Sequence, residues 1–405
     1  MIKKTIGAHN TRVLFWYNLL GTISFIQPVL TLFYLSRGIN DSMILWMMLA
    51  WSFAILVGEV PTGMIADRFG AKTAFITGSS VKIVSLSVLI FAHHPLTFFI
   101  SQFLSGLSAA FFSGADEALI YDSLKVDQEE DRMDQAMGKI QSAPFLSMLF
   151  AVILGAVLAK DLTQSEFILL LGLGVLSEAV GIVILLFITS PATHTAYRDN
   201  PFKQVKEGVQ VIRKTPQLLV MFLNVTLVFI PAGAIFGNFD QPFLQKAGLP
   251  VPYLGIVYAA AAILGFFASQ NIRFLTQRFS RVFLLYFTGV VAALALLMAF
   301  LEGNQLFTAL IVFFVLRWVR AIRYPIYSQL SNDWIPSHVR ATTISLLSII
   351  DSVADLFIFS LSAFVAVYGL SPLFLACAGI ALIGTFLPIK HNVKETLAKQ
   401  AGVSE

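Results

Sequence analysis

The chain has 405 residues, of which only 12% are charged and 57% are hydrophobic, and its formal net charge is +4. A soluble domain carries roughly 25% charged residues, so the composition excludes a soluble globular protein. The single cysteine, Cys377, excludes a disulfide framework and a cysteine-based metal site, and the six histidines show no metal-ligand spacing.

Twelve long hydrophobic blocks follow one another along the sequence. A bilayer core needs about 20 apolar residues per helix, and stretches such as Phe167–Thr189 and Val282–Phe300 reach that length. We expect no cleaved signal peptide, because the first block lacks a small-residue cleavage site. In chain order, transmembrane helices are predicted at 13–36, 43–66, 71–92, 95–124, 134–159, 165–189, 217–245, 251–272, 282–301, 304–330, 340–367 and 370–389.

Lys and Arg residues predict which side of the membrane each connection faces, because they are enriched in cytoplasmic loops. With the N-terminus inside, about 20 of the 27 Lys and Arg residues fall on the cytoplasmic side. Only Arg37, Lys160 and Lys246 fall outside. A miscount of one helix would destroy this asymmetry. We therefore expect an even number of helices, both termini in the cytoplasm, and a multi-pass protein of the bacterial inner membrane.

The longest connection, 190–216, lies halfway along the chain. Its apolar residues Phe202, Val205, Val209 and Ile212 recur at helical spacing, opposite lysines and an arginine. This pattern predicts an amphipathic helix on the cytoplasmic membrane surface. The expected domains are an N-terminal six-helix bundle at 1–189, a cytoplasmic amphipathic linker at 190–216, and a C-terminal six-helix bundle at 217–405 with a short cytoplasmic tail.

An internal repeat relates the two halves. The pairs Ile120-Tyr121 and Ile326-Tyr327 are each followed, at the same spacing, by a leucine. Each match alone could be chance, but with the six-plus-six layout they favour duplication. The predicted fold class is an all-α membrane protein with twelve transmembrane helices in two pseudo-symmetric six-helix bundles. A parallel repeat of this kind places the substrate site between the halves, near the bilayer midplane.

The segment that joins the second and third predicted helices carries the strongest local motif of the chain. One interpretation of this motif is that it forms an ordinary charged turn. Gly63 allows close helix approach, Gly70 suits a tight turn, and Asp67 can accept hydrogen bonds from a helix N-terminus across the loop. The motif consists of Gly63, Asp67, Arg68, Gly70 and Lys72. It resembles the loop signature G-x-x-x-D-R-x-G-x-K of the major facilitator superfamily.

This resemblance covers essentially the whole chain in its layout. It implies a secondary active transporter that works by alternating access, with the first, fourth, seventh and tenth helices around the substrate cavity. It also implies that Asp67 engages the start of the eleventh helix and closes the cytoplasmic side in the outward-facing state. A segment such as Arg340–Leu346 looks like that of a less characterised bacterial permease branch.

Two positions depart from the proton-coupled drug antiporters of the superfamily. Those antiporters usually carry an arginine in the fourth helix, where this chain has Gln102. They also carry a Gly-Pro pair in the fifth helix, where this chain has Ser142-Ala-Pro144. Both departures argue against an ordinary drug/proton antiporter.

The tenth predicted helix carries three arginines on one face. At 100° per residue, Arg317, Arg320 and Arg323 span about 120° of the helix, and Tyr324 and Tyr327 fall on the same face. Ionisable residues within membrane helices are costly and usually functional. One interpretation is an anion-binding wall, since Arg binds carboxylate or phosphate in bidentate fashion. The other is that each arginine is permanently paired with an acid.

The fourth predicted helix carries Asp116 and Glu117 at a depth that matches these arginines. Glu117 corresponds to Arg323 at the offset of the repeat. We therefore hypothesise that Asp116 or Glu117 pairs with Arg320 or Arg323 and helps to close the cytoplasmic gate. Asp122 lies on another face of the helix, where a structural role is favoured.

Five acidic residues are candidates for proton coupling, since a carboxylate inside the membrane suits a proton carrier. The alternative for each is a hydrogen-bonded role in packing. We give Lys82 and Glu178 less weight, because the third and sixth helices are usually peripheral in this fold. The five proton-coupling candidates are Glu59, Asp116, Glu117, Asp351 and Asp355.

Polar residues of the first and seventh predicted helices complete the expected cavity lining. The stretch Asn238–Phe243, which contains Pro242, could bend the seventh helix and act as the extracellular gate. The alternative is interhelical hydrogen bonding. The residues are Tyr17, Asn18, Gln27, Asn224, Asn238, Asp240 and Gln241.

These observations predict a secondary active transporter, proton-coupled, that moves a small organic solute. Acids on one half and arginines on the other favour an anionic or zwitterionic solute, such as a metabolite or a siderophore-like chelator. The alternative is a proton-coupled multidrug exporter, and a distant one is a non-transporting receptor. The sequence contains no nucleotide-binding loop and no catalytic Ser/His/Asp set, so we predict no enzyme. We expect a monomer in the lipid bilayer with its substrate and protons as partners, and no cofactor, metal or nucleic acid.

Overall fold

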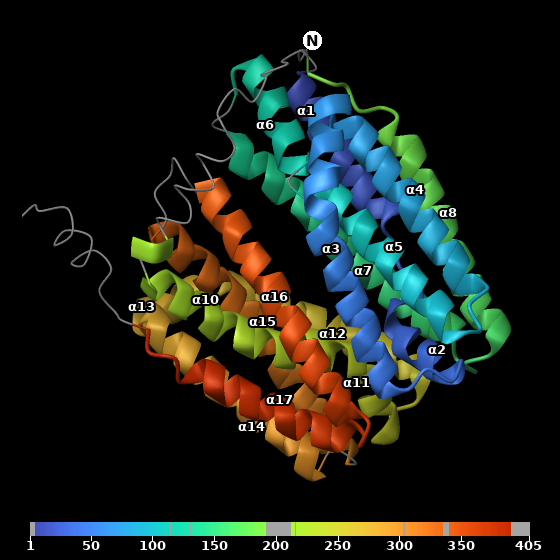
Figure 1. Cartoon of the computed structure of the whole chain (residues 1–405), viewed down its shortest axis with the longest axis vertical. Coiled ribbons are helices and arrows are strands. Elements are labelled where there is room, and N and C mark those ends of the chain that lie inside the picture. Colours follow the sequence, from blue (N-terminus) through green and yellow to red (C-terminus); the bar gives the residue numbers. More distant parts are fainter. Residues whose placement is uncertain are drawn as a thin grey trace, which may run out of the picture. The chain divides into compact units, whose positions relative to one another are not determined.

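The computed structural model describes residues 5–113, 115–129, 132–191, 212–214, 216–302, 305–334 and 340–389. In these ranges the regular structure is helical and contains no strand (Figure 1). Nine of the described helices are long and apolar enough to cross a membrane. The predicted all-α membrane fold is thereby confirmed.

The chain divides into two compact units. The N-terminal unit contains Met1–Ala196 and Leu249–Ala262, and the C-terminal unit contains Tyr197–Gly248 and Ile263–Glu405. The predicted surface helix within 190–216 falls almost entirely outside the described residues. The predicted domain boundaries at 189 and 217 therefore stay predictions.

The helices between residues 6 and 185, which lie in the N-terminal unit, follow the first six predicted blocks. They are α1 (Ile6–Trp16), η1 (Tyr17–Gly21), η2 (Gln27–Val29), α2 (Leu30–Ser36), α3 (Asp41–Phe69), α4 (Ala71–Ile90), α5 (Pro95–Phe112), α6 (Ala115–Asp127), α7 (Met133–Leu158) and α8 (Gln164–Leu185).

The remaining helices follow the last six predicted blocks. They are α10 (Pro216–Phe229), η4 (Ile230–Ile235), α11 (Phe236–Lys246), α12 (Val251–Gln270), α13 (Ile272–Arg278), α14 (Arg281–Glu302), α15 (Leu306–Trp334), α16 (Arg340–Ala366) and α17 (Leu370–Thr385).

The first predicted helix, 13–36, differs most from the structure. It begins earlier, at Ile6, where the Thr5 side chain caps the backbone N–H of Ala8. It then passes into the π-helical turn η1, breaks after Gly21, and resumes at η2 with Pro28 in its first turn. Hydropathy alone does not register this break, because the residues on both sides of it are mostly apolar.

The seventh predicted helix also differs from expectation. Its irregular part is the π-helical turn η4, which contains Pro231, whereas α11 runs through Pro242 as a regular α-helix. The bend and the extracellular gate that we predicted within Asn238–Phe243 stay predictions. Each unit thus carries a π-helical turn in its first long helix, and such turns often occur at functional sites.

Helix ends carry the expected local chemistry. Asn40 caps α3 by accepting a hydrogen bond from Met43 N at 2.8 Å. Gly70, with φ +85°, turns the chain between α3 and α4, as predicted for the loop motif. Thr163 and Glu166 form a capping box at the start of α8.

In the N-terminal unit, α4 packs against both α5 and α8, and η1 packs against α8 (Figure 1). In the C-terminal unit, α14 packs against α15 and α17, and α10 packs against α17. Each arrangement surrounds a buried hydrophobic cluster, which includes Phe75 in one unit and Phe222 in the other. These clusters position the helices that line the two cavities described below.

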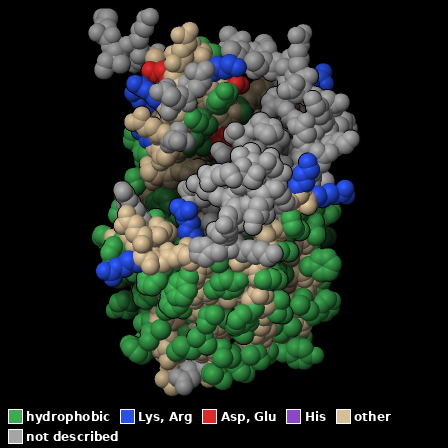
Figure 2. Space-filling model, turned by 90° about the vertical axis from the view of Figure 1, so that its left-hand side faces the viewer, with side chains coloured by type: hydrophobic (Ala, Val, Ile, Leu, Met, Phe, Trp, Pro, Cys, Tyr) green, Lys and Arg blue, Asp and Glu red, His purple; other side chains and the backbone are tan. Residues whose placement is uncertain are grey.

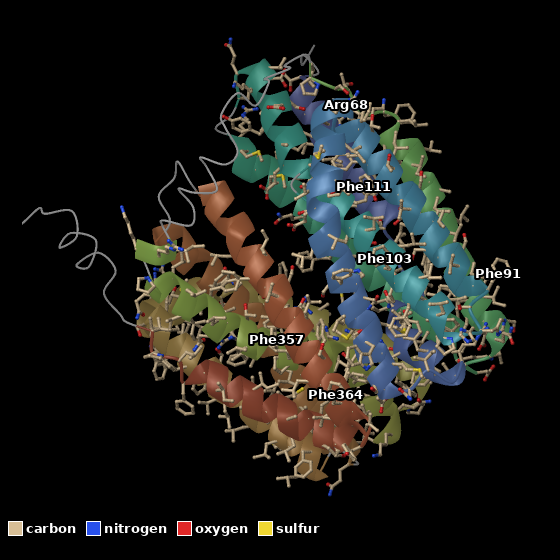
Figure 3. The ribbon with its side chains drawn as sticks, viewed as in Figure 1. Arg68, Phe91, Phe103, Phe111, Phe357 and Phe364 are labelled. Atoms are coloured by element: carbon tan, nitrogen blue, oxygen red, sulfur yellow. The ribbon has the colours of Figure 1, made fainter. Side chains whose placement is uncertain are left out.

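The surface carries many large hydrophobic side chains, as expected for a protein embedded in lipid. Figure 2 shows a face on which they gather densely in the lower part of the view. Phe287 on α14 and Phe357 and Phe364 on α16 belong to the exposed set, and the latter two are labelled in Figure 3. Arg68 and Phe91 mark the regions before and after α4 in the same figure.

Candidate functional site

A cavity lies within each unit. The N-terminal cavity, of about 310 Å³, is lined by residues of α1, η1, α3, α4, α5, α6 and α8. The C-terminal cavity, of about 140 Å³, is lined by residues of α10, η4, α15 and α16. Each cavity includes residues of the first and fourth predicted helices of its own unit. The substrate site predicted between the halves stays a prediction.

Aromatic rings form one side of the N-terminal cavity. Phe112 of α5 stacks on Tyr17 of η1 at 5.6 Å and on Phe75 of α4 at 5.4 Å between ring centroids. Offset stacking of this kind contributes roughly 0.5–1.5 kcal/mol per pair beyond area burial. Trp51 of α3 also lines the cavity.

Close backbone contact holds η1 against α8. A Cβ on Gly21 would lie 2.7 Å from the Cα of Gly181, and one on Gly181 would lie 2.9 Å from the Cα of Gly21. The Ser177 hydroxyl of α8 also donates a hydrogen bond to the Leu20 carbonyl of η1. This contact brings Tyr17 next to the membrane-embedded part of α8.

Three charged residues line the same cavity. Lys82 of α4 donates a hydrogen bond from Nζ to Ser105 Oγ at 2.8 Å. Glu178 of α8 is 7% exposed, and Asp116 of α6 accepts a hydrogen bond from Glu117 N at 2.9 Å. Asn18, predicted to line the cavity, is part of its surface.

The structure thus gives Lys82 and Glu178 a place that sequence reasoning undervalued. Both were recognisable as charges in apolar helices, which is a signal of function. They received little weight because their helices were assumed to be peripheral. In the N-terminal unit, however, α4 and α8 pack together and supply both side chains to the cavity.

Apolar side chains dominate the C-terminal cavity. Its polar and charged lining is limited to Thr226, Arg320, Arg323, Tyr327 and Asp351. Tyr327 lies 6.1 Å from Phe222 between ring centroids. The apolar and small lining residues are Phe222, Val225, Val228, Phe229, Ala232, Gly233, Leu316 and Val319.

The three arginines of α15 have different environments. Arg317 forms an ion pair with Asp240 of α11, whose side chain is fully buried, at 2.5 Å. Arg317 therefore fits the interpretation of a permanent pair with an acid. Its guanidinium also lies 5.2 Å from the ring centroid of Phe313.

Arg323 is 4% exposed and is bound by neutral oxygens. It donates to Asn224 Oδ1 at 2.8 Å, Asn224 O at 3.1 Å, Leu285 O at 2.5 Å and Thr288 Oγ1 at 3.2 Å. Asn224 in turn donates to the carbonyls of Gly384 and Thr385. This network connects α10, α14, α15 and α17, so Arg323 acts first as an interhelical link.

Arg320 is the solvent-exposed arginine of the three. Its guanidinium lies 5.3 Å from the ring centroid of Phe229, a cation–π contact, and it lines the C-terminal cavity. On the same cavity, Asp351 accepts a hydrogen bond from Thr226 Oγ1 at 2.9 Å. Of the predicted arginine wall, Arg320 is thus the member most available to a ligand.

Several predicted site residues line neither cavity. Glu117 and Gln27 are exposed, and Glu59 and Asp355 are half-buried. The predicted pairing of Asp116 or Glu117 with Arg320 or Arg323 joins the two units and stays a prediction.

The polar residues of α11 face its own unit. Gln241 is 2% exposed, and Asn238 donates a hydrogen bond to the Ala234 carbonyl at 2.9 Å. This bond joins residues four apart along the chain, so the interhelical hydrogen bonding that we left open stays a prediction. The side chain of Tyr324 lies outside the described set.

The loop motif contributes one contact that the sequence did not reveal. Lys72 Nζ donates to the carbonyls of Leu186 at 2.6 Å and Ile188 at 3.1 Å, just after α8. A Cβ on Gly63 would meet no described atom within 4 Å, so the close helix approach expected there is not seen. Arg68 is exposed, and the Asp67 side chain is outside the described set.

Comparison with known proteins places the chain in a family. The family model described as "Major Facilitator Superfamily" matches residues 18–316. Among curated proteins, the multidrug resistance protein MdtH of Salmonella arizonae is 25% identical over 256 residues, and that of Salmonella typhi is 26% identical. These matches cover 62% of this chain and 60% of each relative.

Solved structures share the fold at low sequence identity. The nucleoside transporter NupG gives a TM-score of 0.70 at 13% identity, covering 94% of this chain and 97% of that one. A POT family transporter in complex with a thioalcohol-conjugated peptide gives 0.72 at 12% identity, covering 97% and 96%. The family match, the fold and the membrane helices agree. The chain belongs to the Major Facilitator Superfamily and is a multi-pass membrane protein.

Proposed function

We propose that the protein is a proton-coupled exporter of amphipathic organic compounds that works by alternating access. The composition of the C-terminal cavity supports this most directly. Eight of its thirteen lining residues are Phe, Val, Leu, Ala or Gly, and Tyr327 adds a further aromatic ring. Its charged lining residues are Arg320, Arg323 and Asp351. Mostly apolar, aromatic pockets with a few polar groups are suited to drug-like ligands.

The environment of the arginines argues in the same direction. An anion-binding wall would need several arginines available to a carboxylate or phosphate. Arg317 is paired with Asp240, and Arg323 is occupied by Asn224, Leu285 and Thr288. This distribution favours the multidrug exporter that the sequence left as the alternative over the anionic or zwitterionic solute of our main prediction.

The names of the curated relatives also support the proposed drug export. Two that carry the name multidrug resistance protein are 25% and 26% identical to this chain. The structural neighbours include a nucleoside transporter, a POT family transporter in complex with a conjugated peptide and a D-xylose-proton symporter, so the fold alone does not select a substrate. We therefore base the substrate class on the cavity and use the relatives as secondary support.

The arginine missing from the fourth helix calls for a different coupling group. Gln102 Nε2 donates a hydrogen bond to the buried Tyr34 hydroxyl at 2.9 Å. A neutral contact thus occupies the place of the charge found in drug antiporters. We infer that proton coupling in this protein uses another ionisable group.

Transport by the purified protein in proteoliposomes, with and without an imposed pH gradient, tests the proposal. The panel contains a cationic dye, a neutral amphipathic dye and an organic dicarboxylate. We expect the gradient to drive the dyes and to leave the dicarboxylate unmoved. Preferential movement of the dicarboxylate would reject the drug-exporter proposal in favour of the anionic-solute prediction.

A matched pair of phenylalanine variants ties transport to the cavity. Phe229→Ala removes a cavity ring that contacts Arg320 and should lower dye transport roughly two- to tenfold. Phe357→Ala removes a ring that is 76% exposed on α16 and should have little effect. Equal effects of the two changes would mean that the C-terminal cavity does not bind the dyes.

A further inference from the structure

Glu178 has an unusual position for a carboxyl group. It lies on a membrane-spanning helix, is 7% exposed and lines the N-terminal cavity. Its Oε2 atom has no hydrogen-bond partner among the residues that the structure describes. A buried carboxylate oxygen without a donor is costly, so the site is incomplete as it stands.

The charges that surround Glu178 do not balance. The cavity holds the carboxyl groups of Asp116 and Glu178 and the ammonium group of Lys82. When all three are ionised, the cavity carries one uncompensated negative charge. Lys82 Nζ is bonded to Ser105, and within the described residues it makes no ion pair with Glu178. One added proton makes the set neutral, which a low-dielectric site strongly favours.

The other groups that face α8 do not supply the missing charge. Tyr17 of η1 is neutral and bonds to Ser79 Oγ at 2.9 Å. His9 of α1 and Lys72 of α4 bond instead to backbone carbonyls at 186–188, beyond the end of α8. Within the described part of the unit, the positive charge near Glu178 is thus that of Lys82.

We propose that Glu178 is the proton-binding group of this transporter and that Lys82 is its charge partner. The proton forms a bond to Oε2 and converts the carboxylate to a neutral carboxylic acid. Its release restores the carboxylate, and the cavity then carries one net negative charge beside the Lys82 ammonium. This assignment rests on the proposed proton-coupled export, and it replaces the acidic residues that the sequence favoured for this role.

A proton fits this site better than a metal ion. Metal cations need several oxygen ligands, and the described residues contain no cluster of three or more acidic, histidine or cysteine side chains. One side of the cavity is formed by the rings of Tyr17, Phe75 and Phe112. The ammonium of Lys82 would also repel a second cation.

Infrared spectroscopy of the purified protein, without substrate, tests the assignment directly. A protonated carboxyl group in an apolar site gives a C=O stretching band that disappears as the pH rises. We expect Glu178→Gln to remove a titrating band that the wild type shows. Glu166→Gln changes the same residue type on the same helix, keeps its capping box, and should retain the band. A titration spectrum of Glu178→Gln identical to the wild type would overturn the proposal.

The charge balance itself is tested by transport in proteoliposomes. Lys82→Met leaves two uncompensated carboxyl groups and should lower pH-driven export about tenfold or more. Adding Asp116→Asn returns the count to a single carboxyl group that one proton neutralises. The double variant should recover to within about threefold of the wild type. A double variant no better than Lys82→Met would refute the shared charge balance.

The two proposals fail in different ways. If the wild type moves no dye but the infrared band depends on Glu178, then the proton site holds and the proposed drug export is wrong. If dyes are driven by the gradient equally well in the wild type and in Glu178→Gln, then export holds and the proton site is wrong.

Discussion

The π-helical turn η1 and helix α8 cross at Gly21 and Gly181, and neither residue has room for a side chain. A Cβ on Gly181 would lie 2.9 Å from the Gly21 Cα and 2.9 Å from a ring carbon of Tyr17. This crossing keeps the Tyr17 hydroxyl hydrogen-bonded to Ser79, in the cavity that Glu178 also lines. The backbone contact therefore determines which side chains share the N-terminal cavity.

Gly181→Ala should weaken this crossing. The added methyl group cannot fit unless η1 moves away from α8, and overpacking of this kind costs about 1–3 kcal/mol. We expect a lower thermal unfolding temperature of the purified protein and a loss of pH-driven export.

Gly172→Ala is the matched control, because it lies on the same helix and its Cβ would meet nothing within 4 Å. It should be neutral or slightly stabilising, since Ala is a better helix former by about 0.8–1.0 kcal/mol. If both variants unfold at the same temperature as the wild type, the close contact of Gly21 and Gly181 is not important for stability.

The ion pair between Arg317 and Asp240 should be needed as a pair. Asp240 is fully buried, so Asp240→Asn leaves the charge of Arg317 without this partner. Breaking a buried pair from one side typically costs about 3–5 kcal/mol, and Arg317 is 20% exposed, so we expect the lower end of that range. Thermal unfolding of Asp240→Asn should therefore occur at a clearly lower temperature.

The double variant Arg317→Gln/Asp240→Asn completes this test. It removes both charges and retains hydrogen-bonding groups, so it should be more stable than Asp240→Asn alone. A double variant whose destabilisation equals the sum of the two single changes would show that the residues act independently.

The two arginines that line the C-terminal cavity should respond differently to substitution. Arg320→Gln should change substrate preference, because Arg320 is exposed and its described contact is with the Phe229 ring. Arg323→Gln should mainly lower stability, because Arg323 joins α15 to Asn224, Leu285 and Thr288. Hydrogen bonds from charged groups contribute about 1.5–3 kcal/mol each.

Dye transport and thermal unfolding, measured on both variants, separate these effects. The expected pattern is an altered ratio of cationic to neutral dye for Arg320→Gln with an unchanged unfolding temperature. Arg323→Gln should unfold earlier and keep the wild-type ratio. The opposite pattern would make Arg323 the ligand-binding arginine.

Composition was sufficient to predict the helices because lipid imposes a length and an apolar content on each of them. The predicted block 134–159, for example, corresponds to α7 at Met133–Leu158. The interruptions were missed because they depend on tertiary contacts. The π-helical turn at Tyr17–Gly21 forms where Gly181 approaches, and nothing in its own sequence identifies that partner. Similarly, the seventh block contains both Pro231 and Pro242, and only the structure distinguishes their effects.

The candidate site was predictable in its residue types but not in its pairings. Arg323 was recognised as a charge of the tenth helix, yet its partners are largely backbone carbonyls and an amide, which carry no pattern in the sequence. Glu178 and Lys82 were recognised as well, but the family resemblance assigned their helices to the periphery. The packing of α8 against α4 and η1 is what brings them into the cavity.

Lys72, the last residue of the loop motif, should stabilise the protein through α8. Its ammonium group donates to the carbonyls of Leu186 and Ile188, which follow the C-terminal end of that helix, where a positive charge is favourable. Lys72→Met should therefore lower stability by about 1–2 kcal/mol, seen as a lower unfolding temperature. Lys72→Arg retains the charge and the donors and should restore most of this loss. Arg68→Gln, at an exposed position of the same loop, should leave the unfolding temperature unchanged. If Arg68→Gln destabilises as much as Lys72→Met, the stabilising effect belongs to the charge of the loop and not to the bond with α8.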